Sequence, residues 1–203
     1  MSPWWLVPLA YLAGSVPWGL IIVKVVKGVD VRRYGSGKTG MTNVLRTAGR
    51  TAAIVVFAAD ASKAFAMVSL ARLLTDDSAV HASAAAAVIV GHIWPVFAGF
   101  RGGRGIVTGM ATTAVLVPWT AIVGLGVFIP VVAATRYISL GSVLGVTAVV
   151  VAFAAFVVVG MAPTAYLVYA VGCGTLIVWM HRDNIGRLLK GTERKLGQRA
   201  ESV

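Results

Sequence analysis

Hydrophobic residues run through the chain in long blocks, and short polar or glycine-rich segments separate these blocks. A helix needs about 20 mostly apolar residues to cross a bilayer, and most of the blocks approach that length. The pattern predicts seven membrane-spanning helices: Trp4–Val26, Thr51–Leu74, Ala79–Phe100, Ile106–Pro118, Trp119–Thr135, Ile138–Gly160 and Pro163–Met180. Only Pro118 and Trp119 separate the fourth from the fifth, so six spans result if these two form one helix. We therefore predict an all-α integral membrane protein, with residues 1–203 forming one transmembrane domain.

The overall composition agrees with a membrane protein. Of the 203 residues, 58% are hydrophobic and 12% are charged, whereas a soluble domain carries about 25% charged residues. The single cysteine, Cys173, lies inside an apolar block, so we expect neither a disulfide framework nor a thiolate metal site.

Basic residues are distributed unevenly over the two sides of the predicted membrane domain. Of the 18 lysines and arginines, all except Lys63 and Arg72 fall in segments that seven spans place on one side. Loops rich in lysine and arginine face the cytoplasm. We therefore expect a multi-pass protein of the bacterial cell membrane with its N-terminus outside and its C-terminus in the cytoplasm. The first span has no basic region before it, and Lys24 and Lys27 follow it, which indicates a retained helix rather than a signal peptide.

The second span contains two ionisable residues, Asp60 and Lys63. Such residues are costly inside a membrane and are usually paired, and a spacing of three places them on one helix face. We expect an ion pair, with support of an active site beneath the cytoplasmic surface as the alternative.

Three segments outside the spans hold most of the polar chemistry: residues 34–50, 91–109 and 181–195. Each combines glycines or small hydroxyl residues with arginines. Exposed backbone N–H groups and the forked guanidinium group both suit phosphate oxygens. Ordinary positive loops beside anionic lipid would account for the arginines, but not for Ser36, Asn43, His92 and Asn184 beside them. Three such segments on one side predict a site for more than one phosphate.

Residues 35–39, Gly-Ser-Gly-Lys-Thr, resemble the end of a nucleotide-binding P-loop. The P-loop pattern requires a glycine where this chain has Arg32, and it requires a strand before the loop. Here the segment follows a predicted transmembrane helix. The sequence therefore indicates a phosphate site of another kind.

The three segments together resemble the bacterial acyl-phosphate:glycerol-3-phosphate acyltransferases, the PlsY family. The resemblance covers essentially the whole chain and preserves the order and spacing of three family motifs. The first motif is matched by Gly35, Ser36, Gly37, Gly40, Thr42, Asn43 and Arg46, the second by Gly91, His92, Pro95, Phe97, Gly102, Gly103 and Gly105, and the third by His181, Arg182, Asn184, Ile185, Arg187, Leu188, Gly191 and Glu193. The chain departs from the family at Lys38, Met41 and Arg104, where the family has asparagine, alanine and lysine.

The resemblance implies that the protein transfers a fatty acyl group from acyl phosphate to the 1-hydroxyl of glycerol 3-phosphate. It also implies a membrane lipid environment and a functional link to the enzyme that makes acyl phosphate. It implies no cofactor, no metal and no nucleic-acid partner. The expected catalytic residues are Ser36, Arg46, His181 and Asn184. The expected substrate-binding residues are Gly35, Gly37, Lys38, Thr42, Asn43, His92, Arg101, Gly102, Gly103, Arg104, Gly105 and Arg182.

These residues have distinct expected roles. Ser36 and Asn184 are expected to orient the reacting hydroxyl or the phosphates, and Arg46 and Arg104 to neutralise phosphate charge. The glycines at 102, 103 and 105 are expected to offer backbone N–H donors. His181 is expected to orient a substrate or shuttle a proton. His92 is interpreted equally as structural or catalytic, and Glu193 as the partner of an arginine.

The chain lacks the catalytic patterns of other acyltransferases and hydrolases. The fifth residue after His81, His92 and His181 is never an aspartate, so the His–Asp pair of common acyl-CoA glycerolipid enzymes is missing, as is a Gly-x-Ser-x-Gly motif. An acyl phosphate is already activated, so positioning and charge stabilisation are the main needs. Two alternatives remain open. One is a transporter of an anionic solute, although the halves show no internal repeat; the other is a non-catalytic paralogue.

Overall fold

The computed structural model describes residues 2–198, and the elements of regular structure in that range are helices joined by loops. Each long apolar block of the sequence forms a helix, because a helix satisfies its backbone groups internally where no water is available. The α-helices are α1 (Leu6–Gly14), α2 (Trp18–Lys27), α3 (Met41–Ala48), α4 (Arg50–Leu74), α5 (Ser78–Ile93), α6 (Ile106–Leu116), α7 (Pro118–Thr135), α8 (Ile138–Val158), α9 (Thr164–Met180) and α10 (Arg182–Leu189), with short 3₁₀ turns at Pro3–Trp5, Val31–Arg33 and Val96–Ala98.

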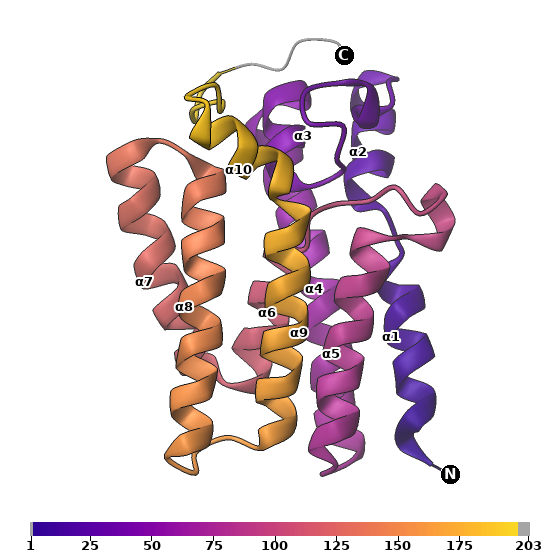
Figure 1. Ribbon diagram of the computed structural model, residues 1–203. Coiled ribbons are helices and arrows are strands. Elements are labelled where there is room, and N and C mark those ends of the chain that lie inside the picture. The colour runs from indigo at the N-terminus through magenta and orange to yellow at the C-terminus, as the bar shows by residue number, and fades with distance from the viewer. Residues whose placement is uncertain (1, 199–203) are drawn as a thin grey trace.

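The long helices lie roughly along one direction, while α3 and α10 gather at one end of the bundle (Figure 1). Helix α1 packs on α5 at a very close approach. A Cβ atom on Gly14 would lie 2.3 Å from the carbonyl oxygen of Val88, and one on Gly91 would lie 2.2 Å from that of Tyr11. Small residues at these positions therefore allow the two backbones to touch, as is common between membrane helices.

Helices α6, α7, α8 and α9 form the other half of the molecule. Each contacts the next, and α9 also contacts α6, so the four helices surround a common interior. In Figure 1 the α7–α8 pair stands apart from α5 and α1, with α6 and α9 between them. This ring of four helices encloses the space in which the candidate site lies.

The predicted count of seven spans is not confirmed. Within residues 2–198, five helical segments are long and apolar enough to cross a membrane, or six if the bent pair α9 and α10 counts as one span. The predicted fourth span forms α6, which has 11 residues. At a rise of 1.5 Å per residue it is about 16 Å long, roughly half the thickness of a bilayer core. The predicted fourth and fifth spans are nevertheless separate helices, because the chain leaves the helical conformation at Val117.

Two predicted spans have interruptions that the sequence prediction missed. The first is divided into α1 and α2 at residues 15–17, where Pro17 lacks an N–H group to continue the helix. The third was expected to reach Phe100, but α5 ends at Ile93, two residues before Pro95. Both breaks bring irregular backbone close to the polar segments described below.

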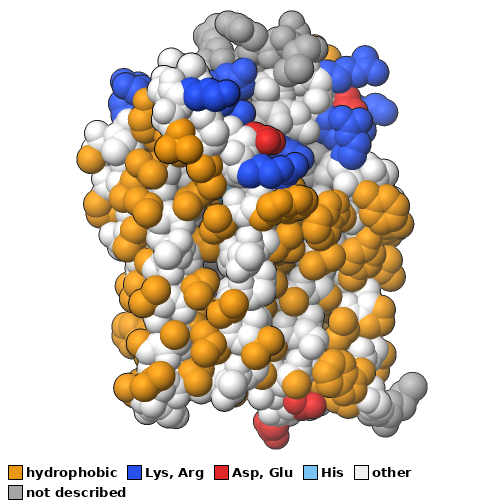
Figure 2. Space-filling model, viewed as in Figure 1, with side chains coloured by type: hydrophobic (Ala, Val, Ile, Leu, Met, Phe, Trp, Pro, Cys, Tyr) orange, Lys and Arg blue, Asp and Glu red, His pale blue; other side chains and the backbone are white. Residues whose placement is uncertain are grey.

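Charge is concentrated at one end of the molecule. Lysine and arginine side chains gather at the end that carries α10 (Figure 2). Hydrophobic side chains are spread over the remaining visible surface, with acidic side chains at the opposite end. Helix α1 begins at the opposite end from α10 (Figure 1). This distribution agrees with the asymmetry expected from the sequence.

Candidate active site

The three motif segments meet at the basic end of the bundle and line one cavity of about 570 Å³. The cavity extends from these polar segments into the ring formed by α6, α7, α8 and α9. Its lining includes Ser36, Lys38, Thr42, Asn43, Arg46, Asp60, His92, Arg104, Gly105, His181, Asn184 and Glu193. All four residues expected to be catalytic lie on this one surface.

The first motif segment is a tight loop held together by Asn43. The amide nitrogen of Asn43 lies 2.9–3.1 Å from three carbonyl oxygens between residues 31 and 38. Its Oδ1 accepts a hydrogen bond of 3.0 Å from the Ser36 N–H group. Gly35 and Gly37 have positive φ values, which glycine adopts without strain. The side-chain polar atoms of Asn43 thus form hydrogen bonds within the loop that carries Ser36 and Lys38. The sequence prediction had instead assigned Asn43 to substrate binding.

The glycines of the second segment serve close packing around His92. The Gly103 N–H group donates to the His92 carbonyl oxygen and that of Gly102 to the Ile93 carbonyl oxygen, both at 3.1 Å. A Cβ atom on Gly103 would lie 2.0 Å from His92 Nε2. The N–H groups of Gly102 and Gly103 already have backbone partners, so the geometry does not support their predicted role as donors to a ligand. Gly105, at φ 87°, lines the cavity and begins α6.

A buried ionic cluster supports this segment from below. Lys63 Nζ lies 2.8 Å from Asp60 Oδ1 and donates to the Val16 carbonyl oxygen at 2.9 Å. His92 Nδ1 lies 3.4 Å from Asp60 Oδ1 and 3.3 Å from Lys63 Nζ. The ion pair predicted within the second span is confirmed. It links α4 to the break between α1 and α2 and to the second motif segment.

Three cations on the cavity wall have no carboxylate partner within residues 2–198. Lys38, Arg46 and Arg104 line the cavity, and the ion pairs of the described chain include none of them. In the described part of the chain, Arg46 donates only to the Arg194 carbonyl oxygen and Arg104 only to that of Met180, each at 3.3 Å. The two carboxylates on the wall, Asp60 and Glu193, are paired with cations that lie outside the lining.

Burial changes the acidity of these cations. It lowers the pKa of Arg104 to about 10, and the charge of the neighbouring Arg187 acts in the same direction. Burial also lowers the pKa of Lys38, helped by Arg104, and that of Arg46, helped by Arg194. Partly desolvated cations without partners are unfavourable. An anionic ligand in the cavity would relieve this cost.

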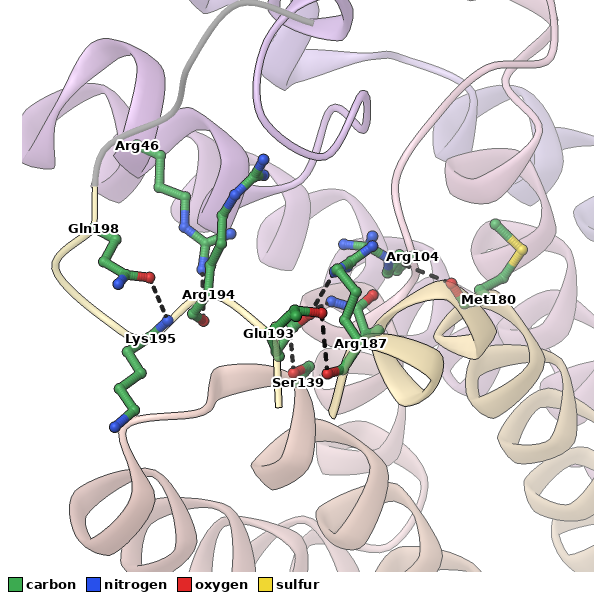
Figure 3. A network of polar contacts seen from close by, with 11 residues as sticks. Arg46, Arg104, Ser139, Met180, Arg187, Glu193, Arg194, Lys195 and Gln198 are labelled. Carbon is green, nitrogen blue, oxygen red and sulfur yellow. Dashed lines mark hydrogen bonds and ion pairs between the residues drawn. The ribbon is translucent and has the colours of Figure 1, made fainter. Parts of the chain in front are cut away.

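In the third segment, Glu193 gathers three donors (Figure 3). Its Oε1 accepts from Ser139 Oγ at 2.8 Å and from Asn184 Nδ2 at 2.6 Å, and its Oε2 accepts from Arg187 Nε at 2.7 Å. Burial alone would raise the pKa of Glu193, but these hydrogen bonds, led by that of Asn184, hold it below the usual value. The expected pairing of Glu193 with an arginine is confirmed.

Asn184 presents one free acceptor in this wall. Because its NH₂ group donates to Glu193, its orientation is fixed. Its Oδ1 is buried and has no hydrogen-bond partner in the described chain. An unpartnered buried acceptor is uncommon, and a substrate hydroxyl group would satisfy it.

His181 is held as a neutral imidazole. Its Nδ1 lies 2.8 Å from the Ile177 carbonyl oxygen, which can only accept, so Nδ1 carries the proton and Nε2 is a free acceptor. Burial lowers the pKa of His181 to about 4. The neutral ring can therefore accept a hydrogen bond at Nε2 at neutral pH.

This pKa predicts how stability depends on pH. Between pH 6.5 and about 4 the unfolded chain binds a proton at His181 that the folded chain does not, so folding stability should fall as pH decreases. The slope is about 1.4 kcal/mol per pH unit. The difference in thermal stability between the wild-type protein and His181→Gln, measured in detergent, should decrease from pH 7 to pH 5. A constant difference would contradict the buried neutral state.

Six of the expected substrate-binding residues are not part of the cavity lining: Gly35, Gly37, Arg101, Gly102, Gly103 and Arg182. Arg101 and Arg182 are the two charged residues among them. Arg101 is exposed and does not belong to the lining. Arg182 is also exposed, and its guanidinium carbon lies 4.3 Å from the ring centroid of Trp179, to which it is bound by a cation–π contact. Direct contact of either side chain with a ligand in the cavity is not supported by this geometry.

The apolar half of the cavity was not predicted. It is lined by helices α6 to α9, and its lining includes Gly109, Met110, Gly124, Phe128, Val132, Gly141, Gly145, Val146, Val149, Val150, Tyr169, Cys173, Gly174 and Ile177. Gly141 and Gly145 of α8 both line the cavity, and Gly141 also packs against Val132 and Phe128 of α7. The same glycines also leave room inside the ring. In the sequence, an apolar residue that lines a cavity looks the same as an apolar residue that packs against another helix.

Comparison with known proteins gives consistent matches. A model of the glycerol-3-phosphate acyltransferase family matches residues 4–191. The glycerol-3-phosphate acyltransferase of Rubrobacter xylanophilus is 46% identical over 198 residues, covering 96% of this chain and 96% of that protein. Glycerol-3-phosphate acyltransferase 3 of Dehalococcoides mccartyi is 41% identical, covering 95% and 94% respectively.

Solved structures match as well. The crystal structure of PlsY, an integral membrane glycerol 3-phosphate acyltransferase, in its glycerol 3-phosphate form is similar with a TM-score of 0.89 at 36% identity, covering 97% of this chain and 96% of that one. Its lysophosphatidic acid form gives a TM-score of 0.86 with the same identity and coverage.

Proposed function

The chain belongs to the glycerol-3-phosphate acyltransferase family, and from that premise we propose that it transfers a fatty acyl group from acyl phosphate to the 1-hydroxyl of glycerol 3-phosphate. The product is 1-acyl-glycerol 3-phosphate, or lysophosphatidate, the first intermediate of phospholipid synthesis. The related PlsY structures in glycerol 3-phosphate and lysophosphatidic acid forms support this choice of acceptor and product.

One feature of the cavity supports the proposal most directly. Its polar end carries three cations that have no carboxylate partner among residues 2–198, and its other end is an apolar space within the ring of α6 to α9. Acyl phosphate joins a phosphate to a long apolar chain, and glycerol 3-phosphate brings a second phosphate. Lys38, Arg46 and Arg104 would bind these phosphates through charge-assisted hydrogen bonds, while the acyl chain would enter the ring.

The reaction needs little chemistry from the protein. The hydroxyl oxygen attacks the acyl carbonyl carbon, an ester C–O bond forms, and the bond from that carbon to the phosphate oxygen breaks. Inorganic phosphate leaves with the hydroxyl proton. The free Oδ1 of Asn184 would orient the attacking hydroxyl group, and Ser36, on the first motif loop, lines the same cavity. Nε2 of His181 is a second acceptor within the same lining.

The charge distribution supports a site on the cytoplasmic side of the cell membrane. The cavity's polar end is lined by Lys38, Arg46 and Arg104. Lysines and arginines gather at the end of the bundle that carries α10 (Figure 2), and basic segments face the cytoplasm. Acyl phosphate made by a cytoplasmic or membrane-bound enzyme would reach the site from that side.

Donor choice tests the function. Purified protein incubated with labelled glycerol 3-phosphate should form labelled lysophosphatidate from acyl phosphate, and at least tenfold more slowly from acyl-CoA. The reason is that acyl-CoA has no phosphate attached to its acyl carbonyl group, where the cations would bind it. The chain also lacks a His–Asp pair to activate the acceptor. Equal rates with both donors would contradict the proposed donor. Transport of labelled solute into proteoliposomes without any lysophosphatidate would favour a transporter instead.

A further inference from the structure

The depth of the apolar cavity can be read along α9. This helix ends at the polar site, where His181 follows its last residue. Its innermost residue in the cavity lining is Tyr169. Twelve residues of helix separate the two, which corresponds to about 18 Å at 1.5 Å per residue. Tyr169 therefore lies deep in the membrane domain, far from the reacting groups.

Helix α8 gives an independent measure of the same depth. Ser139 marks the polar end, because its hydroxyl group donates to Glu193. Val150, eleven residues further along α8, is its innermost residue in the lining, and the helical rise places it about 16 Å deeper. The cavity thus ends at a similar depth on two of its walls.

Tyr169 is a rigid wall at this end. Its hydroxyl oxygen lies 2.6 Å from Thr112 Oγ1, which itself donates to the Gly109 carbonyl oxygen at 2.8 Å. Because threonine has one hydroxyl hydrogen, the Tyr169 hydroxyl group must be the donor in their contact. The ring of Phe153 packs edge-on against Tyr169, with the centroids 6.2 Å apart. Hydrogen bond and packing together fix the orientation of the phenol ring.

We propose that Tyr169, fixed by Thr112, is the stop that sets the longest acyl chain the enzyme accepts. This inference rests on the proposed function and deepens it by naming a specificity-determining residue. If an acyl chain is too long, its end meets the phenol ring of Tyr169 before its carbonyl carbon reaches Asn184. The carbonyl carbon then lies too far from the attacking hydroxyl group of glycerol 3-phosphate. Each methylene beyond that length should cost about tenfold or more in kcat/KM.

The test is a profile of kcat/KM against donor chain length, measured with acyl phosphates that differ by two carbons. The wild-type profile should fall sharply beyond one length. Tyr169→Ala should shift that fall by at least two carbons toward longer chains, because it removes the ring. Tyr169→Phe should leave the cutoff in place, because it removes only the hydroxyl group. A Tyr169→Ala profile that coincides with the wild-type profile would overturn the proposal.

A second pair of variants tests the same cavity without removing the tyrosine. Gly174 lines the cavity about 10 Å from the polar end by the helical rise, and a Cβ atom there would lie 2.6 Å from Val150 Cγ2. Gly172, on the same helix, has no atom within 4 Å of its added Cβ. Gly174→Ala should therefore shift the preference toward shorter chains, while Gly172→Ala should not. If both variants show the same shift in chain-length preference, or if neither shows one, the proposed path of the acyl chain to Tyr169 is contradicted.

Failure of the inference is distinguishable from failure of the function. Wild-type protein that forms no lysophosphatidate from acyl phosphate of any length would overturn both. If the protein is active but its dependence of kcat/KM on chain length is unchanged by substitutions at residues 169 and 174, only the role of Tyr169 is overturned.

Discussion

Replacing Arg104 by alanine should lower kcat/KM about ten- to a hundredfold, whereas Arg104→Lys should retain most of the activity. A charge-assisted hydrogen bond contributes roughly 1.5–3 kcal/mol, and each factor of ten in rate corresponds to about 1.4 kcal/mol. Arg104 lines the cavity, and its guanidinium group has a backbone carbonyl oxygen as its only hydrogen-bond partner in the described chain. A bound phosphate would therefore depend on this charge. Lysine keeps the charge and loses only the forked geometry.

Arg101 provides a matched control in the same loop. It is exposed and lies outside the cavity lining, so Arg101→Ala removes the same charge from the same segment without removing a ligand. Steady-state kinetics with each substrate varied in turn should place Arg104→Ala well below Arg101→Ala. Equal, small effects of both would show that Arg104 acts only as a basic residue near anionic lipid headgroups.

The difference between these two arginines illustrates what the sequence predicts and what it does not. Both occur in a glycine-rich basic segment, and charge asymmetry was enough to place that segment on the side where the polar motifs gather. The direction of each side chain depends on the backbone between them. There the N–H groups of Gly102 and Gly103 are tied to the end of α5. A pattern of residue types does not contain that information.

Glycine was the least reliable guide for the same reason. A missing side chain can expose an N–H group, permit a positive φ or allow two groups to touch. Gly103 is present because His92 fills the space of its Cβ atom, which is a contact between separate segments. In contrast, long apolar helices such as α4 and α8 were predicted closely, because the length of an apolar block is a local property. The short α6 was wrongly predicted to cross the membrane by itself. Its apolar block continues into that of α7, and only Val117 interrupts the helix between them.

The Asp60–Lys63 pair was predicted from spacing alone, and its burial gives the largest expected effect on stability. Lys63→Met should lower the free energy of unfolding by about 3–5 kcal/mol, because it leaves the Asp60 carboxylate buried without its partner. Both side chains are at most 7% exposed. The substitution also removes the hydrogen bond from Lys63 to the Val16 carbonyl oxygen, which joins α4 to the break in the first span.

The double variant Asp60→Asn, Lys63→Met separates the two contributions. Removing both charges should restore part of the lost stability, since no unpaired charge then remains buried and only the hydrogen bonds are missing. Lys24→Met is the control, because Lys24 is exposed in α2 and a surface change of this kind is usually within about 0.5 kcal/mol. Thermal unfolding in detergent should rank Lys63→Met below the double variant, and the double variant below Lys24→Met. If Lys63→Met is at least as stable as the double variant, Asp60 is not charged in the folded protein, and the cluster beneath His92 is a neutral hydrogen-bond network.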